Sequence, residues 1–273
     1  MSRLLRRLNV ADLLAVAYTA GYFCWLALRT PGTSATALAG EFTFYPLGLA
    51  VAWASWRTSR LPFLDRRTRL AWRLHMGSAI SLFVSGTAWS IYSRLFGASG
   101  TSSWVEYLEV VSVVLAMAGF IAFPGRALAG RGRTRFFLDA TLMAVAGFAV
   151  ALYFGLRLWF GRLQSEPFTP AELARVIDWI NFVVVAVAVL QKRQAATRAA
   201  LGAFLLEGGA YLVGNYIYLS ASPDAYHSGD AVDGFWFAAW ALRWAAARVV
   251  WYRCRETAGE PDDPADAVAT TYE

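Results

Sequence analysis

The sequence predicts an all-α integral membrane protein, a polytopic bundle of about eight transmembrane helices. Hydrophobic residues make up 58% of the 273 residues and charged residues only 16%, whereas a soluble domain carries about 25% charged residues. The hydrophobic residues gather into long blocks, which is typical of membrane spans. Basic residues cluster in every second connection, as the positive-inside rule expects. The net charge of +6 is therefore explained by topology, and no nucleic-acid partner is expected.

Eight stretches approach the roughly 20 residues that a helix needs to cross a bilayer core of about 30 Å. They are expected at 10–28, 36–56, 74–95, 104–123, 136–158, 173–191, 199–219 and 234–252. The second is the least regular, because Gly40, Glu41 and Pro46 interrupt its first half. The first resembles a cleaved signal peptide, since small residues at 35–37 follow a basic start and an apolar run. Retention is favoured, because the run over 10–28 is long for a signal core.

The distribution of basic residues predicts that both termini lie in the cytoplasm. One set of connections holds Arg3, Arg6, Arg7, Arg57, Arg60, Arg66, Arg67, Arg69, Arg73, Arg126, Arg131, Arg133, Arg135, Lys192, Arg193, Arg198, Arg253 and Arg255. The alternate set holds only Arg29, Arg94, Arg157, Arg162 and Arg175. Because basic loops stay inside, the first set is expected on the cytoplasmic side of a bacterial inner (plasma) membrane, with the bilayer itself as the main partner.

The chain is expected to form one membrane domain over residues 1–256, followed by a tail over 257–273. The tail contains two prolines, acidic residues and no basic residue, so it is expected to be a disordered cytoplasmic end. No separate soluble domain is expected. The two cysteines, Cys24 and Cys254, fall near opposite sides of the predicted bundle, which argues against a disulfide between them.

Glu207 and Arg243 are the most deeply placed charged residues of the predicted spans. Glu207 lies eight residues from the inner end of its span and Arg243 nine from the inner end of the next. At about 1.5 Å per residue their depths agree within a few Å, so adjacent antiparallel helices could pair them. Such a pair is either a structural lock between two helices or part of a ligand or ion site.

A second group of charged residues gathers toward the outer face. Glu106 and Glu109 open the fourth span, Asp178 lies five residues into the sixth, and Arg94 and Arg175 are close in height. Carboxylates facing basic side chains could bind a polar ligand in a cleft, although hydrogen bonding between helices explains them equally well. This outer group is the better candidate for a ligand site.

The last span carries a stripe of large aromatic residues. Trp236, Trp240, Trp244 and Arg248 follow one another at steps of four residues, and alanines at 238, 241 and 245 form another face. Because small residues allow helices to approach closely, the alanine face is expected to pack inward. The tryptophan face is then expected to meet lipid, with a flat ligand or pigment as the alternative.

Motifs that mark an enzyme or a cofactor site are not found. The sequence contains no G-x-S-x-G, H-E-x-x-H, Walker A or C-x-x-C pattern. The only lysine, Lys192, lies in an inner loop, so a retinal Schiff base is excluded. His75 and His227 fall on opposite sides of the membrane, which does not support a haem held by two histidines. No metal, cofactor or catalytic residue is assigned.

The segments FYPLGLAVAW, SSWVEYLEVV, RTRFFLDATLMAVA and DGFWFAAWALRWAAARVVWYR resemble the multi-helix membrane region that precedes diguanylate cyclase (GGDEF) domains in bacterial signalling proteins. No GGDEF string follows Glu256. The resemblance implies a non-enzymatic membrane sensor or binding module that acts through a partner signalling protein. Two alternatives stay open: an accessory subunit of a larger, cofactor- or pigment-containing membrane complex, and a small transporter or membrane enzyme that uses Glu207 and Arg243.

Overall fold

The computed structural model describes residues 9–30, 32–96, 103–123, 170–191, 195–220 and 228–258. Over these residues the chain is entirely helical and contains no strand. The helices are α2 (Val10–Leu28), α3 (Ser34–Ser59), α4 (Arg66–Phe96), α5 (Ser103–Ala122), α8 (Pro170–Gln191), α9 (Ala195–Ser220) and α10 (Asp233–Ala258). The predicted all-α class is thus confirmed for the described part of the chain.

Seven of the eight predicted spans coincide with described helices, and the eighth, at 136–158, lies outside the described residues. Three described segments are long and apolar enough to cross a membrane, namely Val10–Leu28, Ala35–Ser59 and Trp104–Ala122. They indicate a membrane protein. Of the predicted tail over 257–273, residues 257 and 258 continue α10 as helix, and the remainder lies outside the described residues.

Helix α4 begins eight residues before the predicted start at 74, because a capping residue lies outside the apolar block. Asp65 accepts hydrogen bonds from the N–H of Arg67 (2.9 Å), the N–H of Thr68 (3.0 Å) and the Thr68 hydroxyl (2.6 Å). A side chain that satisfies the first free N–H groups fixes the start of a helix. The arginines expected in a connection therefore form the first turns of α4.

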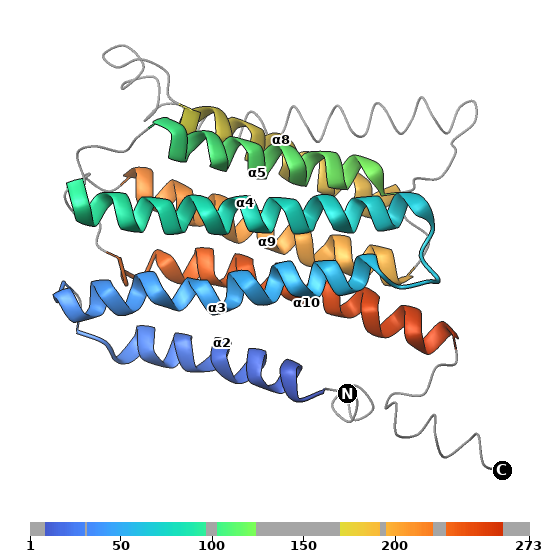
Figure 1. Cartoon of the computed structure of the whole chain (residues 1–273), viewed down its shortest axis with the longest axis horizontal. Helices are drawn as coiled ribbons and strands as arrows, with labels where there is room; N and C mark the ends of the chain where they lie inside the picture. The colour runs from blue at the N-terminus through green and yellow to red at the C-terminus, as the bar shows by residue number, and fades with distance from the viewer. Residues whose placement is uncertain are drawn as a thin grey trace.

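The helices lie side by side with their axes along one common direction (Figure 1). Six of them form a closed ring, in which α3 packs on α4, α4 on α5, α5 on α8, α8 on α9, α9 on α10 and α10 on α3. Helix α2 lies outside this ring, beside α3 and α10 (Figure 1). The ring encloses the interior of the molecule, and α2 leaves much of its own surface exposed, including Leu13, Leu14 and Val16.

Arginine and tryptophan meet where α3 and α10 finish and α4 begins, which we call the basic end of the bundle. Trp251 is buried, and the guanidinium carbons of Arg248, Arg255 and Arg57 lie 4.4, 4.7 and 5.5 Å from its ring centroid. Contacts of a cation with an indole face are favourable, and both groups are common at membrane interfaces. This arrangement agrees with the basic end lying at a membrane surface.

The basic half of the ring is filled by an aromatic plug, which consists of Trp72, His75, Phe120, Phe123 and Phe204. The His75 ring stacks on Phe204 at 4.5 Å and lies 4.6 Å from Phe120. The ring centroids of Trp72 and Phe123 are 5.8 Å apart. Alanine, valine and leucine side chains from all six ring helices surround the plug. The interior is therefore closed on the side of the basic end.

Candidate functional site

A cavity of about 60 Å³ lies inside the helix ring, next to the plug. Its walls come from α4, α5, α8, α9 and α10. Phe120 and Phe204 of the plug line it on one side, whereas its polar lining consists of Ser78, Ser112, Asp178, Asn181, Glu207, Tyr211 and Arg243. A space of this size holds about four water molecules or one small ligand. Charged side chains at such depth are costly in a bilayer and usually serve a ligand, an ion or an interhelical contact.

Glu207 and Arg243 form the ion pair that their matched depths predicted. The Nε of Arg243 lies 3.0 Å from Oε1 of Glu207, and the two side chains are 7% and 16% exposed. The N–H does not point along this line, so the contact is an ion pair without an aligned hydrogen bond. Because both side chains also line the cavity, the pair locks α9 to α10 and contributes charge to the site.

Asp178 and Asn181 lie one helical turn apart on α8 and share the face that lines the cavity. The Nδ2 of Asn181 donates to the carbonyl oxygen of Val113 on α5 at 3.0 Å. Among the described residues, the buried Oδ2 of Asp178 and Oδ1 of Asn181 have no hydrogen-bond partner. Helix α8 therefore presents two unpaired oxygen atoms to the cavity.

Asp178 lies further from the start of its helix than the sequence predicted. The predicted span began at residue 173, whereas α8 begins at Pro170, whose ring suits the first position of a helix. Asp178 is then eight residues into the helix, or about 12 Å along its axis, and it comes within electrostatic range of Glu207 and Arg243. The outer group and the Glu207–Arg243 pair, which the sequence predicted as separate, therefore form one continuous polar array.

The outer part of this array consists of the other predicted residues. The Tyr211 hydroxyl donates to Oε1 of Glu109 at 3.3 Å, and Glu109 is within electrostatic range of Arg175 and Glu106. Tyr211 thereby connects Glu109 to the cavity that it lines. Arg94 lies in the last turn of α4, and its side chain falls outside the described part. Polar residues thus continue from the cavity toward the end opposite the basic end.

Serine side chains join α4 to α5 along the wall of the cavity. The Ser78 and Ser112 hydroxyls lie 3.1 Å apart, and Ser112 Oγ donates to the Ser78 carbonyl oxygen at 2.9 Å. Ser81 and Ser85 donate to the carbonyl oxygens of Leu108 and Val105 at 2.7 and 3.0 Å. Small hydroxyl residues permit close helix approach and hydrogen-bond across it in membranes. These bonds hold α4 against α5, and they occupy the hydroxyl donors of the serines.

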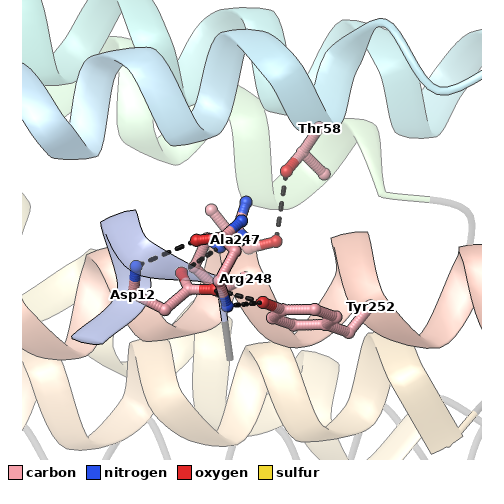
Figure 2. Close-up of polar contacts among 6 residues, drawn as sticks. Asp12, Thr58, Ala247, Arg248 and Tyr252 are labelled. Atoms are coloured by element: carbon pink, nitrogen blue, oxygen red, sulfur yellow. Dashed lines mark hydrogen bonds and ion pairs between the residues drawn. The ribbon is translucent and has the colours of Figure 1, made fainter. Parts of the chain in front are cut away.

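A second buried ion pair, which the sequence analysis did not identify, joins α2 to α10 (Figure 2). The Nε and Nη2 of Arg248 donate to Oδ1 and Oδ2 of Asp12 at 2.7 and 2.9 Å. The Tyr252 hydroxyl also donates to Asp12, and Asn9 caps α2 through the Asp12 N–H at 3.0 Å. Asp12 is 1% exposed and Arg248 4%. We call Asp12, Arg248 and Tyr252 the α2–α10 clamp.

The sequence held one signal for this clamp. Asp12 and Arg248 lie at similar distances from the inner ends of the first and last predicted spans, which is the depth argument that identified Glu207 and Arg243. Arg248 was instead assigned to the tryptophan face, which was expected to meet lipid. That expectation is wrong, because Trp240 is buried and lines the cavity and Arg248 is buried in the clamp. The part of this face that carries Trp240 and Arg248 therefore packs inward.

Comparison with known proteins gives no relative for this chain: no protein-family model, no curated protein sequence and no solved structure matches it. Among the described residues, no group of three or more histidine, cysteine, aspartate or glutamate side chains could hold a metal ion. Both cysteines are free.

Proposed function

We propose that this chain is a membrane-embedded binding module of the sensor type, whose cavity takes a small polar ligand and whose response passes to a partner protein. The observation that carries the proposal is the cavity inside the helix ring, which is lined by Asp178, Glu207 and Arg243. Lipid does not stabilise such groups, and a structural ion pair alone does not require space beside it. The resemblance to the membrane regions of GGDEF proteins agrees with a sensory role.

The polar array supports a direction for ligand entry. The aromatic plug closes the basic half of the ring, whereas Glu109, Tyr211 and Arg175 continue the polar lining toward the opposite end. With the basic end in the cytoplasm and both termini on that side, the ligand enters from the outer face of a bacterial inner membrane. Orientation and compartment belong to the proposal and follow from the positive-inside rule.

Helix α10 is the element that would carry the response. It contributes Arg243 to the cavity and, five residues further, Arg248 to the α2–α10 clamp. A ligand that draws Glu207 or Asp178 away from Arg243 changes the charge balance on α10. When a ligand binds, a helix that takes part in both the ligand site and a second interhelical contact can shift the equilibrium between two packings of the bundle. The partner protein is expected to contact α10 at the basic end.

The test is gentle detergent extraction from the native membrane, followed by mass spectrometry of the small molecules and proteins that stay bound. A cavity-filling variant, Gly208→Leu, provides the comparison, because Gly208 lines the cavity and a Cβ there already lies 3.2 Å from Phe182. Gly202→Leu is the matched control on the same helix, since nothing lies within 4 Å of its Cβ position. We expect a small polar molecule bound to the natural protein and to Gly202→Leu, and lost from Gly208→Leu.

Other results would favour the alternatives. Stoichiometric membrane subunits or an absorbing pigment, with no small molecule sensitive to Gly208→Leu, would contradict the binding module and favour an accessory subunit. Solute movement into vesicles by the reconstituted protein, abolished by Glu207→Gln without loss of folding, would favour a transporter. An absorption spectrum and a flux assay on the same preparation separate these cases.

A further inference from the structure

Most hydrogen-bond donors of the cavity are engaged, and the exception is Arg243 Nε, which forms an ion pair without an aligned hydrogen bond. Tyr211 donates to Glu109, the Arg243 guanidinium faces Glu207 at 3.0 Å, and the Ser78 and Ser112 hydroxyls bond one another. The nitrogen of Asn181 donates to a backbone carbonyl on α5. A carboxylate or a phosphate would have to compete with Glu207 for Arg243 or break one of the other contacts.

Among the described residues, two of the three buried atoms of the cavity lining that lack a hydrogen bond are acceptors. Asp178 Oδ2 and Asn181 Oδ1 are buried, line the cavity and have no hydrogen-bond partner among the described residues. The orientation of the Asn181 amide follows from its bond to the Val113 carbonyl oxygen, which accepts only from the amide nitrogen. Unpaired buried acceptors are costly, so the site is complementary to a group that donates at least two hydrogen bonds.

Charge and size restrict the ligand further. The lining carries two carboxylates, Asp178 and Glu207, and one guanidinium, Arg243. A ligand with one positive charge balances this set, and the aromatic side chains of Phe182 and Trp240 belong to the same lining. The volume of about 60 Å³ admits only a few non-hydrogen atoms. Taking the proposed binding function as given, we infer that the cavity binds a small hydrogen-bond-donating cation, of the class of protonated primary amines, through Asp178 and Asn181.

The experiment measures the thermal unfolding of the purified, detergent-solubilised protein in an amine-free buffer at fixed ionic strength. The probes are methylammonium chloride, methanol as its neutral counterpart of similar size, sodium formate as an anion, and tetramethylammonium chloride as a cation that donates no hydrogen bond. The variants are Asp178→Asn, which keeps the shape and removes the charge, and Asn181→Leu, which removes the second acceptor. Glu256→Gln is the control, because Glu256 is an exposed carboxylate outside the cavity.

We expect methylammonium alone to raise the unfolding temperature in a saturable way, with the same apparent affinity in the natural protein and in Glu256→Gln. Asp178→Asn should weaken that affinity roughly tenfold or more, as for loss of a charged hydrogen bond. If Asp178→Asn does not purify as a folded protein, the same weakening in Asn181→Leu serves as the test.

Two results would overturn the inference while leaving the binding module intact. One is stabilisation by formate or methanol that is lost in Gly208→Leu, and the other is a small anionic or neutral molecule released from the native protein. Equal shifts with methylammonium and tetramethylammonium in all variants would indicate a general salt effect and also overturn it. No shift with any probe, together with no small molecule released from the native protein, would mean a cavity that holds only water and would overturn both proposals.

Discussion

At the scale of single residues, the α2–α10 clamp joins two helices through a buried, bidentate ion pair. Arg248 donates two hydrogen bonds to one carboxylate, and Tyr252 donates a third (Figure 2). Bidentate geometry and additional hydrogen bonds are what make a buried ion pair repay the cost of desolvating both charges. The pair matters because α2 packs only at the edge of the ring, beside α3 and α10.

We predict that breaking the clamp on one side destabilises the protein by about 3–5 kcal/mol, because the remaining charge stays buried without a partner. Asp12→Leu and Arg248→Met are the single variants, and the double variant should recover most of the loss. Unfolding by titration with sodium dodecyl sulfate in mixed micelles measures the change. Glu256→Gln, an exposed position, should stay within about 0.5 kcal/mol of the natural protein. A double variant as unstable as the sum of the singles would contradict the coupling.

A second residue-scale prediction concerns Asp65, the cap of α4. Burial alone would raise its pKa, but hydrogen bonds from the Thr68 hydroxyl and from the N–H groups of Thr68 and Arg67 outweigh it and hold the pKa of Asp65 below its ordinary value of 3.8. A carboxylate with a lowered pKa adds stability that is fully present above its unfolded value. That stability is lost as the pH falls through the lower, folded pKa.

Asp65→Asn should therefore be less stable than the natural protein at neutral pH, by roughly 0.5 to 1 kcal/mol, because it keeps the cap and loses the charge-assisted part of it. The difference should shrink as the pH is lowered below about 4. Unfolding curves of both proteins between pH 7 and pH 3 test this. A difference that stays constant over this range would mean that Asp65 does not act through its charge.

An individual contact could be predicted from the sequence only where two charged residues lie at similar depth in adjacent spans. Glu207 and Arg243 follow one another in adjacent spans, so equal depth made them neighbours. Asp12 and Arg248 are separated by most of the chain, and no rule of adjacency joins the first span to the last. The two unpaired acceptors on α8 were not foreseen, because Asn181 is uncharged and its amide became informative only once its bond to α5 was known.

At the scale of helices, close packing of α4 on α5 depends on small residues opposite large ones. Gly119 faces His75 of the aromatic plug, and a Cβ at this glycine would lie 2.8 Å from the His75 Nε2. His75 is fully buried, stacks on Phe204 and lies 4.6 Å from the tilted ring of Phe120, so these neighbours restrict its movement. The plug therefore requires a glycine at this position of α5.

We predict that Gly119→Ala destabilises the protein by about 1–3 kcal/mol, the usual cost of overpacking a core. Gly202→Ala is the matched control in α9, because nothing lies within 4 Å of its Cβ position. Alanine favours helix over glycine, so this control should be neutral or slightly more stable. Thermal unfolding in the same detergent compares the two. Equal effects of both substitutions would show that the plug can rearrange.

The positions of the helices could be read from the sequence, whereas their ends could not. A hydropathy block stops where arginines begin, but α4 starts at Arg66 and α10 continues to Ala258. Helices extend beyond an apolar block when a cap or helix-forming residues allow it. The inward face of α10 was also assigned wrongly, since small alanines and large tryptophans can both face a protein interior when a buried arginine lies on the tryptophan side.

At the scale of the whole molecule, the clamp bears on whether the first helix stays in the mature protein. Removal of α2 would leave Arg248, which is 4% exposed, without its carboxylate. An uncompensated arginine inside a bundle is strongly unfavourable. We therefore predict that protein purified from its native membrane retains α2, and intact mass measurement tests this. A mass that lacks the segment before residue 35 would show that the helix is cleaved.

The orientation of the bundle is the prediction with the widest consequence, because it decides which side the cavity serves. The N–H of Asn9, at the start of α2, donates to the hydroxyl of Tyr252 near the end of α10, so these two helix ends lie at the same end of the bundle. The arginine and tryptophan contacts lie there too. Since basic segments remain in the cytoplasm, we expect the basic end inside and the opposite end, with Asp230, outside.

Single cysteines test this in a background in which Cys24 and Cys254 are replaced by serine. Arg60→Cys lies between α3 and α4 at the basic end, and Asp230→Cys lies before α10 at the opposite end. A membrane-impermeant maleimide applied to intact spheroplasts should label Asp230→Cys, and it should label Arg60→Cys only after the membrane is permeabilised. The reverse pattern would place the polar array beside Glu109 on the cytoplasmic side, so that the ligand would be an internal metabolite. Labelling of both sites in intact spheroplasts would contradict a bundle that spans the membrane between them.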